Sequence, residues 1–292
     1  MRMVVTGGNG QLGRAIQAVC QQAGSAFGFV CVDQPEWDIT DPAQVERLAD
    51  LKPALVIHCA AMTDVDGCAR NPDLAFKVNA FGTQNVALAC RRAGAAMVYV
   101  STNEVFDGSA GRPYREFDPT GAINVYGASK LAGEMIASRL LHELYVVRVA
   151  WLYSAGGSNF VSKILARADQ FGQLQVVADE VANPTYAPDA AAAMLELVRT
   201  GHYGIYHLVN EGHCSRYEFA QEILKLAGRA HIPVQPITSQ QFQRASTPPP
   251  FSPLRNTVGA ALGIRLRPWQ AALADCLEQS PGALSSKKPP EI

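Results

Sequence analysis

The sequence lacks an uninterrupted apolar run of the length that crosses a membrane, and no basic stretch leads into an apolar segment near its start. Because a transmembrane helix needs about 20 consecutive apolar residues, we expect no membrane partner and no export signal. Dense blocks of lysine and arginine are also missing, and the formal net charge is only -1. A nucleic acid is therefore not an expected partner, and a small molecule is the default ligand.

Cysteine and histidine do not form the patterns that cross-link small domains or bind metals. The 7 cysteines contain no C-x-x-C pair, and their odd number does not suit a complete disulfide framework. Reduced thiols in the cytoplasm fit this composition better. The 6 histidines do not cluster at ligand spacing, so no metal site is predicted.

The sequence does have a regular alternation of strand-like and helix-like segments. With 292 residues, 48% of them hydrophobic, the chain can bury a large core. Short apolar, β-branched runs occur at 1–7, 27–32, 54–59, 95–101 and 144–150, and segments with helical spacing lie between them at 11–23, 42–51, 72–93 and 126–143. This alternation predicts an α/β fold with a doubly wound parallel (Rossmann) sheet, because near-continuous hydrophobic strands belong in a sheet covered on both faces.

After about residue 151 the alternation becomes irregular. Helical patterns at 158–170, 187–200 and 215–228 are separated by short strand-like pieces, and a final helix is expected near Pro268. The run TPPP at 247–250 predicts a rigid loop, since proline interrupts helices and central strands. We therefore expect a dinucleotide-binding domain at 1–150, a smaller, mainly substrate-binding region with returning sheet elements at 151–280, and a disordered polar tail at 281–292.

The first strand runs into the stretch TGGNGQLG, which spaces Gly7, Gly10 and Gly13 three residues apart at the start of a helix. Glycine permits a tight turn and a close approach of pyrophosphate to the backbone, and a helix N-terminus favours its negative charge. A glycine-rich turn alone is usually only a turn. Here a strand precedes it and a helix follows, which predicts a dinucleotide site that also includes Asn9, Gln11 and Leu12.

Asp33 lies twenty positions after Gly13, at the end of the second strand-like run. A carboxylate there can accept hydrogen bonds from a ribose 2′-hydroxyl and would repel a 2′-phosphate, which favours NADH. Arg14 could offset that repulsion and admit NADPH, although a solvated surface arginine is the simpler interpretation. The choice between NADPH and NADH stays open.

The stretch VYGASK places Tyr126 and Lys130 four residues apart, so that a helix would present both side chains on one face. One such pair is weak on its own. Together with the glycine spacing and with Thr102 in STNEVF, however, it resembles the extended short-chain dehydrogenase/reductase family. Stretches such as WDITD (37–41), NPTYAPDAA (183–191) and LRPWQAAL (266–273) resemble in particular the dTDP-4-dehydrorhamnose reductases of that family.

The resemblance implies a soluble enzyme that uses NADPH or NADH to reduce the 4-keto group of a nucleotide-activated deoxysugar, as in dTDP-rhamnose biosynthesis. It implies that Tyr126 gives a proton to the ketone oxygen and that Thr102 hydrogen-bonds the same oxygen. Lys130 would hold the nicotinamide ribose, and its ammonium is expected to lower the pKa of the Tyr126 phenol from about 10.

Further cofactor positions follow from the same resemblance. Asp38 and Ile39 match a pair that contacts adenine, while Ala60, Ala61 and Thr63 match a turn that lies along the cofactor. Asn79 matches an asparagine near the catalytic lysine. Trp151 matches a tryptophan that borders the sugar site, with a buried core tryptophan as the competing interpretation.

The sequence departs from the reductase pattern on the substrate side. Asn103 and Glu104 stand where the family usually has aspartate and tyrosine, Pro248 stands where an arginine is common, and Arg255 stands where an aspartate is common. If the strand continued past Thr102, alternation would point Glu104 to the same side. We therefore expect Glu104 to contact the substrate and Arg255 to contact its phosphates.

Two alternatives remain from the sequence. The chain could be a non-catalytic, dinucleotide-binding regulatory subunit that shares this fold, although an intact Thr102, Tyr126 and Lys130 favours an enzyme. It could also be a related nucleotide-sugar epimerase or dehydratase, but Asn103 cannot donate a proton as a carboxylic acid does. A homodimer is a further expectation that the sequence leaves open.

Overall fold

The computed structural model describes residues 2–22, 28–280 and 283, so the predicted tail at 281–292 lies outside the described residues except for Ala283. Its centre is a six-stranded sheet in the order β10-β5-β4-β3-β1-β2, in which all neighbours are parallel. Its strands are β1 (Arg2–Thr6), β2 (Gly28–Val32), β3 (Leu55–His58), β4 (Ala96–Thr102), β5 (Leu144–Val149) and β10 (Gly204–His207). The predicted doubly wound parallel sheet is confirmed.

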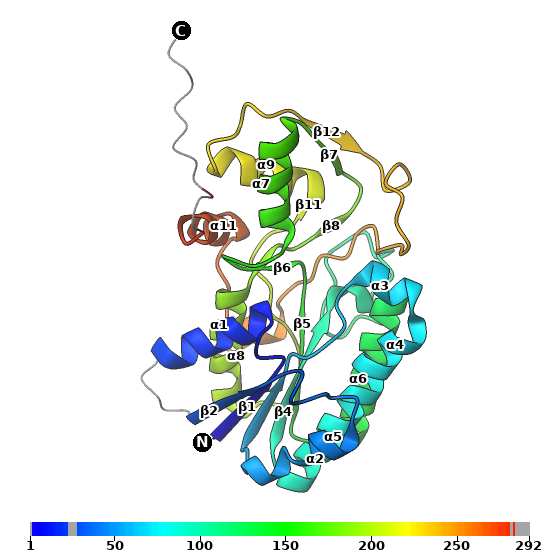
Figure 1. Ribbon diagram of the computed structural model, residues 1–292, viewed down its shortest axis with the longest axis vertical. Helices are drawn as coiled ribbons and strands as arrows, with labels where there is room; N and C mark the ends of the chain where they lie inside the picture. Colours follow the sequence, from blue (N-terminus) through cyan, green and yellow to red (C-terminus); the bar gives the residue numbers. More distant parts are fainter. Residues whose placement is uncertain (1, 23–27, 281–282, 284–292) are drawn as a thin grey trace.

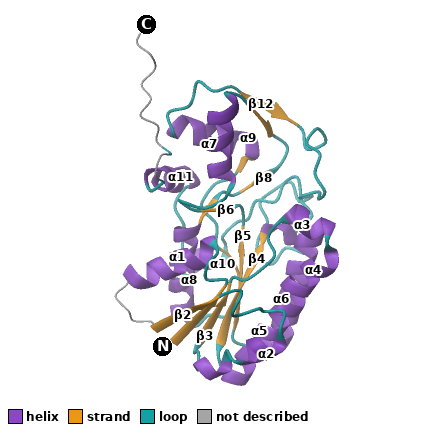
Figure 2. Ribbon diagram, in the orientation of Figure 1, coloured by secondary structure: helices purple, strands orange, loops and turns teal. Residues whose placement is uncertain are grey.

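Two layers of helices cover this sheet, as Figure 2 shows. Helices α1 (Gln11–Gln22) and α8 (Ala187–Thr200) pack on one face with apolar residues of the strands. Helices α2 (Pro42–Glu46), α5 (Thr83–Ala93) and α6 (Val125–Leu140) pack on the other. The three central strands β3, β4 and β5 are buried along their whole length, which is why their sequences are apolar without alternation.

The helix predicted over 72–93 is interrupted in the structure. It consists of α4 (Pro72–Phe76), a π-helical segment η2 (Lys77–Gly82) and α5, and the short helix α3 (Val65–Arg70), which the periodicity did not reveal, precedes it. A π turn widens a helix locally and is frequent at functional sites. Here it contains Asn79, whose side chain is fully buried.

The second half of the chain returns to the sheet through α8 and β10 and otherwise builds a separate layer above it (Figure 1). Helices α7 (Phe160–Phe171), α9 (Arg216–Leu226) and α11 (Trp269–Glu278) share an apolar core with the parallel pair β7 (Leu174–Val177) and β12 (Val234–Ile237). The remaining elements are η1 (Ala49–Leu51), η3 (Asn103–Val105), β6 (Leu152–Tyr153), β8 (Val181–Ala182), β9 (Thr185–Tyr186), β11 (Cys214–Ser215) and α10 (Val258–Ala261).

Candidate active site

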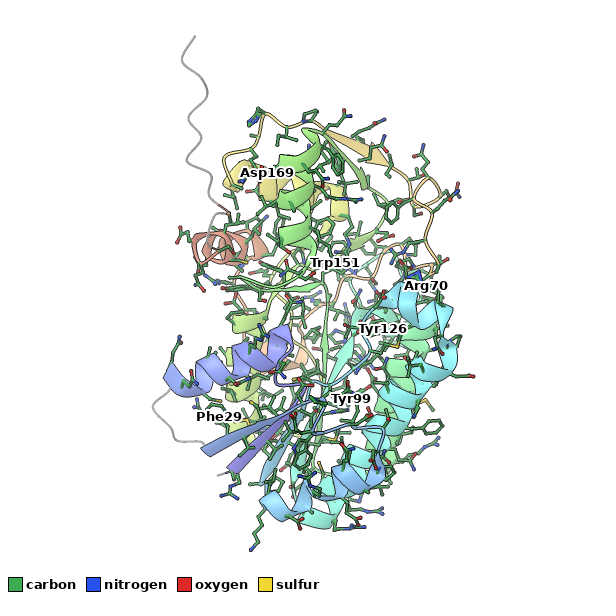
Figure 3. All side chains as sticks on the ribbon, in the orientation of Figure 1. Phe29, Arg70, Tyr99, Tyr126, Trp151 and Asp169 are labelled. Carbon is green, nitrogen blue, oxygen red and sulfur yellow. The ribbon has the colours of Figure 1, made fainter. Side chains whose placement is uncertain are left out.

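A cleft of about 770 Å³ opens at the carboxyl ends of the strands and reaches from the glycine turn to the layer that carries α9. Open α/β sheets bind their ligands at this edge because the strand order reverses there. Tyr99, Tyr126 and Trp151 follow one another from the sheet toward the upper layer (Figure 3). Most of the predicted site residues line this cleft, namely Gly7, Gly10, Gln11, Leu12, Gly13, Asp33, Ile39, Ala60, Ala61, Thr63, Thr102, Glu104, Tyr126, Lys130 and Trp151.

The glycine turn connects β1 to α1 with no room for side chains at two of its positions. Gly7 has φ +69°, and a Cβ there would lie 2.7 Å from the backbone nitrogen of Ala60. A Cβ on Gly13 would lie 2.4 Å from the carbonyl oxygen of Gly7. The Gly10 N–H donates to that same carbonyl at 3.1 Å. These contacts fix the turn directly in front of the α1 N-terminus, the arrangement that suits a pyrophosphate.

Asp33 supports the glycine turn. Its Oδ2 accepts the backbone N–H of Asn9 at 2.7 Å, and its Oδ1 accepts that of Gln34 at 2.8 Å. The carboxylate is half-buried and lines the cleft, so it can also meet a ribose. Asn9 and Arg14 are exposed and do not line the cleft.

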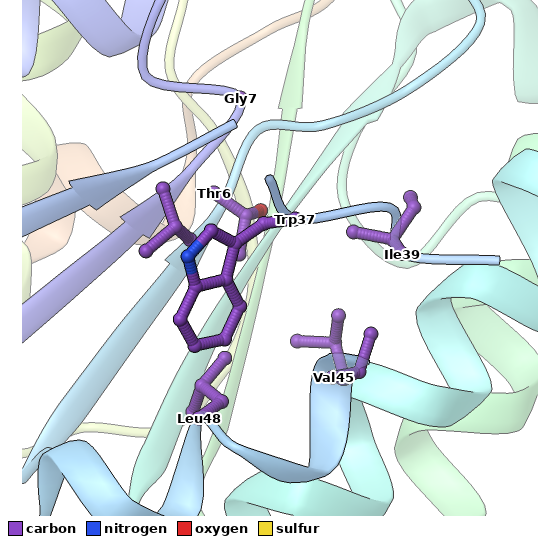
Figure 4. A pocket seen from close by; sticks show the side chains of 8 residues that line it. Thr6, Gly7, Trp37, Ile39, Val45 and Leu48 are labelled. Carbon is purple, nitrogen blue, oxygen red and sulfur yellow. The ribbon is translucent and has the colours of Figure 1, made fainter. Parts of the chain in front are cut away.

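A small apolar hollow adjoins the glycine turn, and the indole of Trp37 lies in it above Val45 and Leu48 (Figure 4). Trp37 and Ile39 line both this hollow and the main cleft. Asp38 does not line the cleft, and its Oδ1 accepts the Thr40 N–H at 2.8 Å, a contact that is the main reason for its lowered pKa. Trp37 is thus a cleft residue that the sequence reasoning missed, although it begins the stretch WDITD.

Asn79 is buried and does not line the cleft, but it holds two parts of the wall together. Its Oδ1 accepts the Met62 N–H at 2.8 Å, and its Nδ2 donates to the Met62 carbonyl at 3.0 Å and to Ser129 Oγ at 2.9 Å. Ser129 Oγ in turn donates to the Tyr126 carbonyl at 2.8 Å. The π segment therefore fixes the turn that follows β3 to the first turn of α6.

Thr102, Tyr126 and Lys130 meet in the middle of the cleft. Thr102 is the last residue of β4, and α6 carries the other two on one face, as the spacing predicted. Helix α6 begins here because the side chain of Asn124 caps it and accepts the Gly127 N–H at 2.8 Å. Lys130 is buried with its Nζ 4.2 Å from the centre of the Tyr99 ring, and Tyr99 Oη donates to the Lys130 carbonyl at 3.0 Å.

The expected lowering of the Tyr126 pKa is wrong for this structure. Burial raises the pKa of the phenol, and the nearby Glu104 carboxylate raises it further, while a hydrogen bond with the Thr102 side chain acts in the opposite direction. Burial also lowers the pKa of Lys130 to about 8. Desolvation therefore dominates the pKa of Tyr126, and the phenol stays protonated at neutral pH.

Glu104 lines the cleft, but not for the reason that strand alternation suggested. The strand ends at Thr102, and residues 103–105 form a 3₁₀ turn whose N-terminus is capped by Thr102 Oγ1, which accepts the Glu104 N–H at 3.2 Å. Glu104 Oε2 accepts Asn124 Nδ2 at 2.6 Å, and burial raises the pKa of this carboxyl. Trp151, which also lines the cleft and is half-buried, adopts φ 40°, a conformation rare for a bulky residue.

The unusual residues of the substrate side contact the proline-rich loop. Asn103 Nδ2 donates to Ser252 Oγ at 2.7 Å, although 149 positions separate the two residues. Asn124 Nδ2, besides its bond to Glu104, donates to the Thr247 carbonyl at 3.3 Å. Two of the stretches that depart from the reductase pattern, the one with Asn103 and the proline-rich one with Ser252, are thus in contact.

Arg255 does not lie where the sequence reasoning expected it. Its side chain is exposed and outside the cleft, while its backbone N–H and carbonyl bind Tyr114 and His207. The cation that does enter the cleft from the upper layer is Arg216, whose guanidinium lies 3.6 Å above the ring of Trp151.

Across the described ranges, no group of His, Cys, Asp and Glu is arranged to hold a metal ion. Nor, within the same ranges, does any helix have the length and apolarity needed to cross a bilayer. All seven cysteines are described, and none forms a disulfide.

A parallel sheet with a glycine turn after its first strand, and a Tyr–Lys pair beside a strand-end threonine, defines the extended short-chain dehydrogenase/reductase class. More narrowly, the chain belongs to the family described as RmlD substrate binding domain, which it matches over residues 1–281. The resemblance predicted from the sequence motifs is confirmed.

Named relatives agree with this assignment. A dTDP-4-dehydrorhamnose reductase of Mycobacterium tuberculosis is 41% identical over 283 residues, covering 94% of this chain and 92% of the relative. A dTDP-4-keto-6-deoxy-D-glucose reductase of Streptomyces niveus is 32% identical over 93% of this chain and 95% of its own. The crystal structure of a Bacillus anthracis dTDP-4-dehydrorhamnose reductase in complex with NADP superposes with a TM-score of 0.92 at 35% identity, covering 96% of this chain and 99% of that one.

Proposed function

We propose that this protein reduces the 4-keto group of a nucleotide-activated deoxysugar with NADPH or NADH. The observation that carries the proposal is the convergence of Thr102, Tyr126 and Lys130 in one cleft with the glycine turn. The names of its relatives support a dTDP-activated sugar and a role in dTDP-rhamnose biosynthesis. The Rossmann domain at 1–150 would hold the dinucleotide, and residues 151–280 would contribute most of the sugar site.

The residues around the glycine turn fit a nicotinamide dinucleotide. The crowding at Gly7 and Gly13 keeps side chains out of these two positions of the turn in front of α1, where a pyrophosphate is stabilised. Asp33 would meet the adenosine ribose, and Trp37 and Ile39 would meet the adenine. The relative bound to NADP supports NADPH, whereas the charge of Asp33 favours NADH. When bound, the nicotinamide supplies the hydride.

The chain's own residues would handle the proton. Tyr126 keeps its phenolic proton at neutral pH, because burial and the Glu104 charge raise its pKa, and so it can donate that proton to the ketone oxygen. The Thr102 hydroxyl would hydrogen-bond the same oxygen and stabilise the developing negative charge. Lys130 would hold the nicotinamide ribose, with its position fixed by Tyr99.

Glu104 and Trp151 would border the sugar. The Glu104 carboxylate already accepts Asn124 Nδ2 with one oxygen, so its other oxygen remains for a sugar hydroxyl. Asn103 is held by Ser252, which supports reduction over elimination of water, since its amide cannot serve as an acid.

The test is the oxidation of reduced cofactor in the presence of a panel of 4-keto sugars. We expect turnover with dTDP-4-dehydrorhamnose or with dTDP-4-keto-6-deoxy-D-glucose, and formation of one reduced sugar for each cofactor oxidised. The UDP-activated counterparts serve as the control for base specificity. Absence of cofactor oxidation with every 4-keto nucleotide sugar, from protein that binds NADPH, would refute the proposal and favour a non-catalytic dinucleotide-binding subunit.

We also propose that the protein works in the cytoplasm as a homodimer. The seven unpaired cysteines support a reducing compartment. The side chains of Phe81 and Met135, on the adjoining segments η2 and α6, are 59% and 50% exposed, and these apolar side chains support association with a second copy. Sedimentation should give twice the monomer mass, and Phe81→Glu should shift it to the monomer. A monomeric parent at micromolar concentration would contradict the homodimer.

A further inference from the structure

Arg216 is a cationic side chain of the cleft that the mechanism described above does not use. Among the described residues that line the cleft, the cations are Lys130 and Arg216. Lys130 lies on the sheet side, against the Tyr99 ring. Arg216 comes from the first residue of α9 in the upper layer, and its guanidinium lies 3.6 Å above the Trp151 ring and 5.0 Å from the centre of the Phe160 ring.

The Arg216 guanidinium is held in place, but its N–H groups are not used as hydrogen-bond donors. Its side chain is 25% exposed, and within the described part of the chain none of its N–H groups donates a hydrogen bond. The nearest carboxylate oxygen, Glu180 Oε2, lies 4.0 Å from Nε. Stacking on an aromatic ring orients the plane of the guanidinium and leaves its edge free to bind an anion.

Glu180 does not neutralise Arg216, because it is shared with a second arginine. Its other oxygen lies 3.2 Å from Nη1 of Arg244, a shorter contact than the one to Arg216. Arg244 is joined in turn to Asp66 at 3.3 Å. Glu180 also fixes the backbone at this point, since its carbonyl accepts the Arg216 N–H at 3.1 Å. Burial lowers the pKa of Arg216 to about 10, while the Glu180 and Glu104 carboxylates act in the opposite direction, so the guanidinium that lines the cleft stays positively charged at neutral pH.

We propose that Arg216 binds the diphosphate of the nucleotide sugar, an inference that rests on the proposed function of the cleft. A diphosphate presents paired oxygens that can accept two parallel hydrogen bonds from one guanidinium. The cofactor pyrophosphate belongs to the glycine turn on the far side of Tyr126, so the cleft needs a second anion site for the substrate. Arg255, which the sequence suggested for this task, is exposed outside the cleft. Arg216 thus determines which ketones are accepted, namely those attached to a diphosphate.

The experiment compares the binding of dTDP and thymidine to the protein saturated with NADP, measured by titration calorimetry. Thymidine carries the same base and sugar without the charge, so the ratio of the two dissociation constants isolates the diphosphate. We expect Arg216→Met to weaken dTDP binding by about 10- to 100-fold, the scale of lost charge-assisted hydrogen bonds, and to leave thymidine unchanged. Arg216→Lys keeps the charge but cannot form two parallel hydrogen bonds, so its dissociation constant for dTDP should lie between those of the parent and of Arg216→Met.

The matched control is Lys225→Met. It removes the same charge from the same helix, but Lys225 is 68% exposed and does not line the cleft, so the preference for dTDP should persist. An unchanged NADPH affinity shows that each variant is folded. A parent that binds dTDP no more tightly than thymidine, or an Arg216→Met variant that keeps the parental preference, overturns the inference.

The two proposals can fail separately. A parent that binds dTDP through Arg216 but reduces none of the 4-keto sugars would refute the reductase function and leave the anion site standing. If the parent reduces dTDP-4-dehydrorhamnose but the Arg216→Met variant still prefers dTDP over thymidine as the parent does, only the role of Arg216 is refuted.

Discussion

Gly127 lies between Tyr126 and the rest of α6, and replacing it with alanine should separate the proton donor from its ketone. A Cβ on Gly127 would lie 2.0 Å from the carbonyl oxygen of Glu104 and 2.8 Å from its carbonyl carbon, closer than the 3.0 Å that real Cβ atoms keep. The obstacle is backbone and cannot rotate away. The first turn of α6 and the 103–105 turn must therefore move apart by about 1 Å, a displacement that can cost about 10²-fold in rate.

Stability should change much less than activity in Gly127→Ala. Overpacking costs about 1–3 kcal/mol, and the better helix propensity of alanine returns about 1 kcal/mol of that. Urea unfolding should thus show a loss of about 0–2 kcal/mol, while kcat/KM with dTDP-4-dehydrorhamnose falls about 10²-fold. The dissociation constant of NADPH should stay close to the parental value, because the glycine turn is untouched.

Gly121→Ala is the matched control for this substitution. The Gly121 N–H donates to the Val105 carbonyl at 2.8 Å, so it touches the same turn, but a Cβ there meets nothing closer than Asp107 Cβ at 3.8 Å. Its kcat/KM should match that of the parent. Parental activity in Gly127→Ala would show that the spacing of these two segments does not control the proton transfer.

Three further predictions concern the cofactor, the pH dependence of stability and the substrate. Asp33→Asn keeps an acceptor for the Asn9 N–H but removes the charge, so the ratio of NADPH to NADH affinity should rise, and an unchanged ratio would remove Asp33 from the ribose site. Burial lowers the pKa of His58 and His207 to about 3 from 6.5, so the unfolded chain binds protons that the folded one refuses, and stability that is full above pH 6.5 is lost as the pH falls toward 3. The free energy of unfolding, measured with urea, should fall by about 2.4 kcal/mol between pH 6 and 5, about 1.2 kcal/mol for each histidine because its unfolded form is only partly protonated at pH 6, whereas a flat profile would contradict the buried neutral state. Glu104→Tyr should change the relative kcat/KM for the sugars of the panel, and efficient parental reduction of dTDP-4-dehydrorhamnose that this substitution leaves unaltered would make the departure at 104 neutral.

The strands and the glycine turn were predictable because their signals are local. Apolar runs such as ALVIHC indicate a strand that is buried on both faces of the sheet. The turn at Gly7 requires a positive φ, which few residues other than glycine adopt. The pairing of Tyr126 with Lys130 was equally local, because one helical turn separates them.

What the sequence did not reveal depends on contacts between distant segments. The π turn at 77–82 forms where Asn79 binds the backbone of Met62, a contact that has no helical periodicity. The raised pKa of Tyr126 results from burial and from a carboxylate twenty-two positions earlier in the chain, neither of which the Y-x-x-x-K pattern contains. Arg216 reaches the cleft only because α9 packs against α7 and β7 in the upper layer, and no spacing rule links it to Trp151.

The most direct test of the central claim is the turnover of Tyr126→Phe with NADPH and dTDP-4-dehydrorhamnose, measured beside the parent. The substitution removes only the hydroxyl that would give its proton to the ketone, in a cleft whose other residues are unchanged. We predict that kcat falls by about 10²- to 10⁴-fold while the dissociation constant of NADPH stays the same. A parental kcat in Tyr126→Phe would contradict the assignment of Tyr126 as the proton donor.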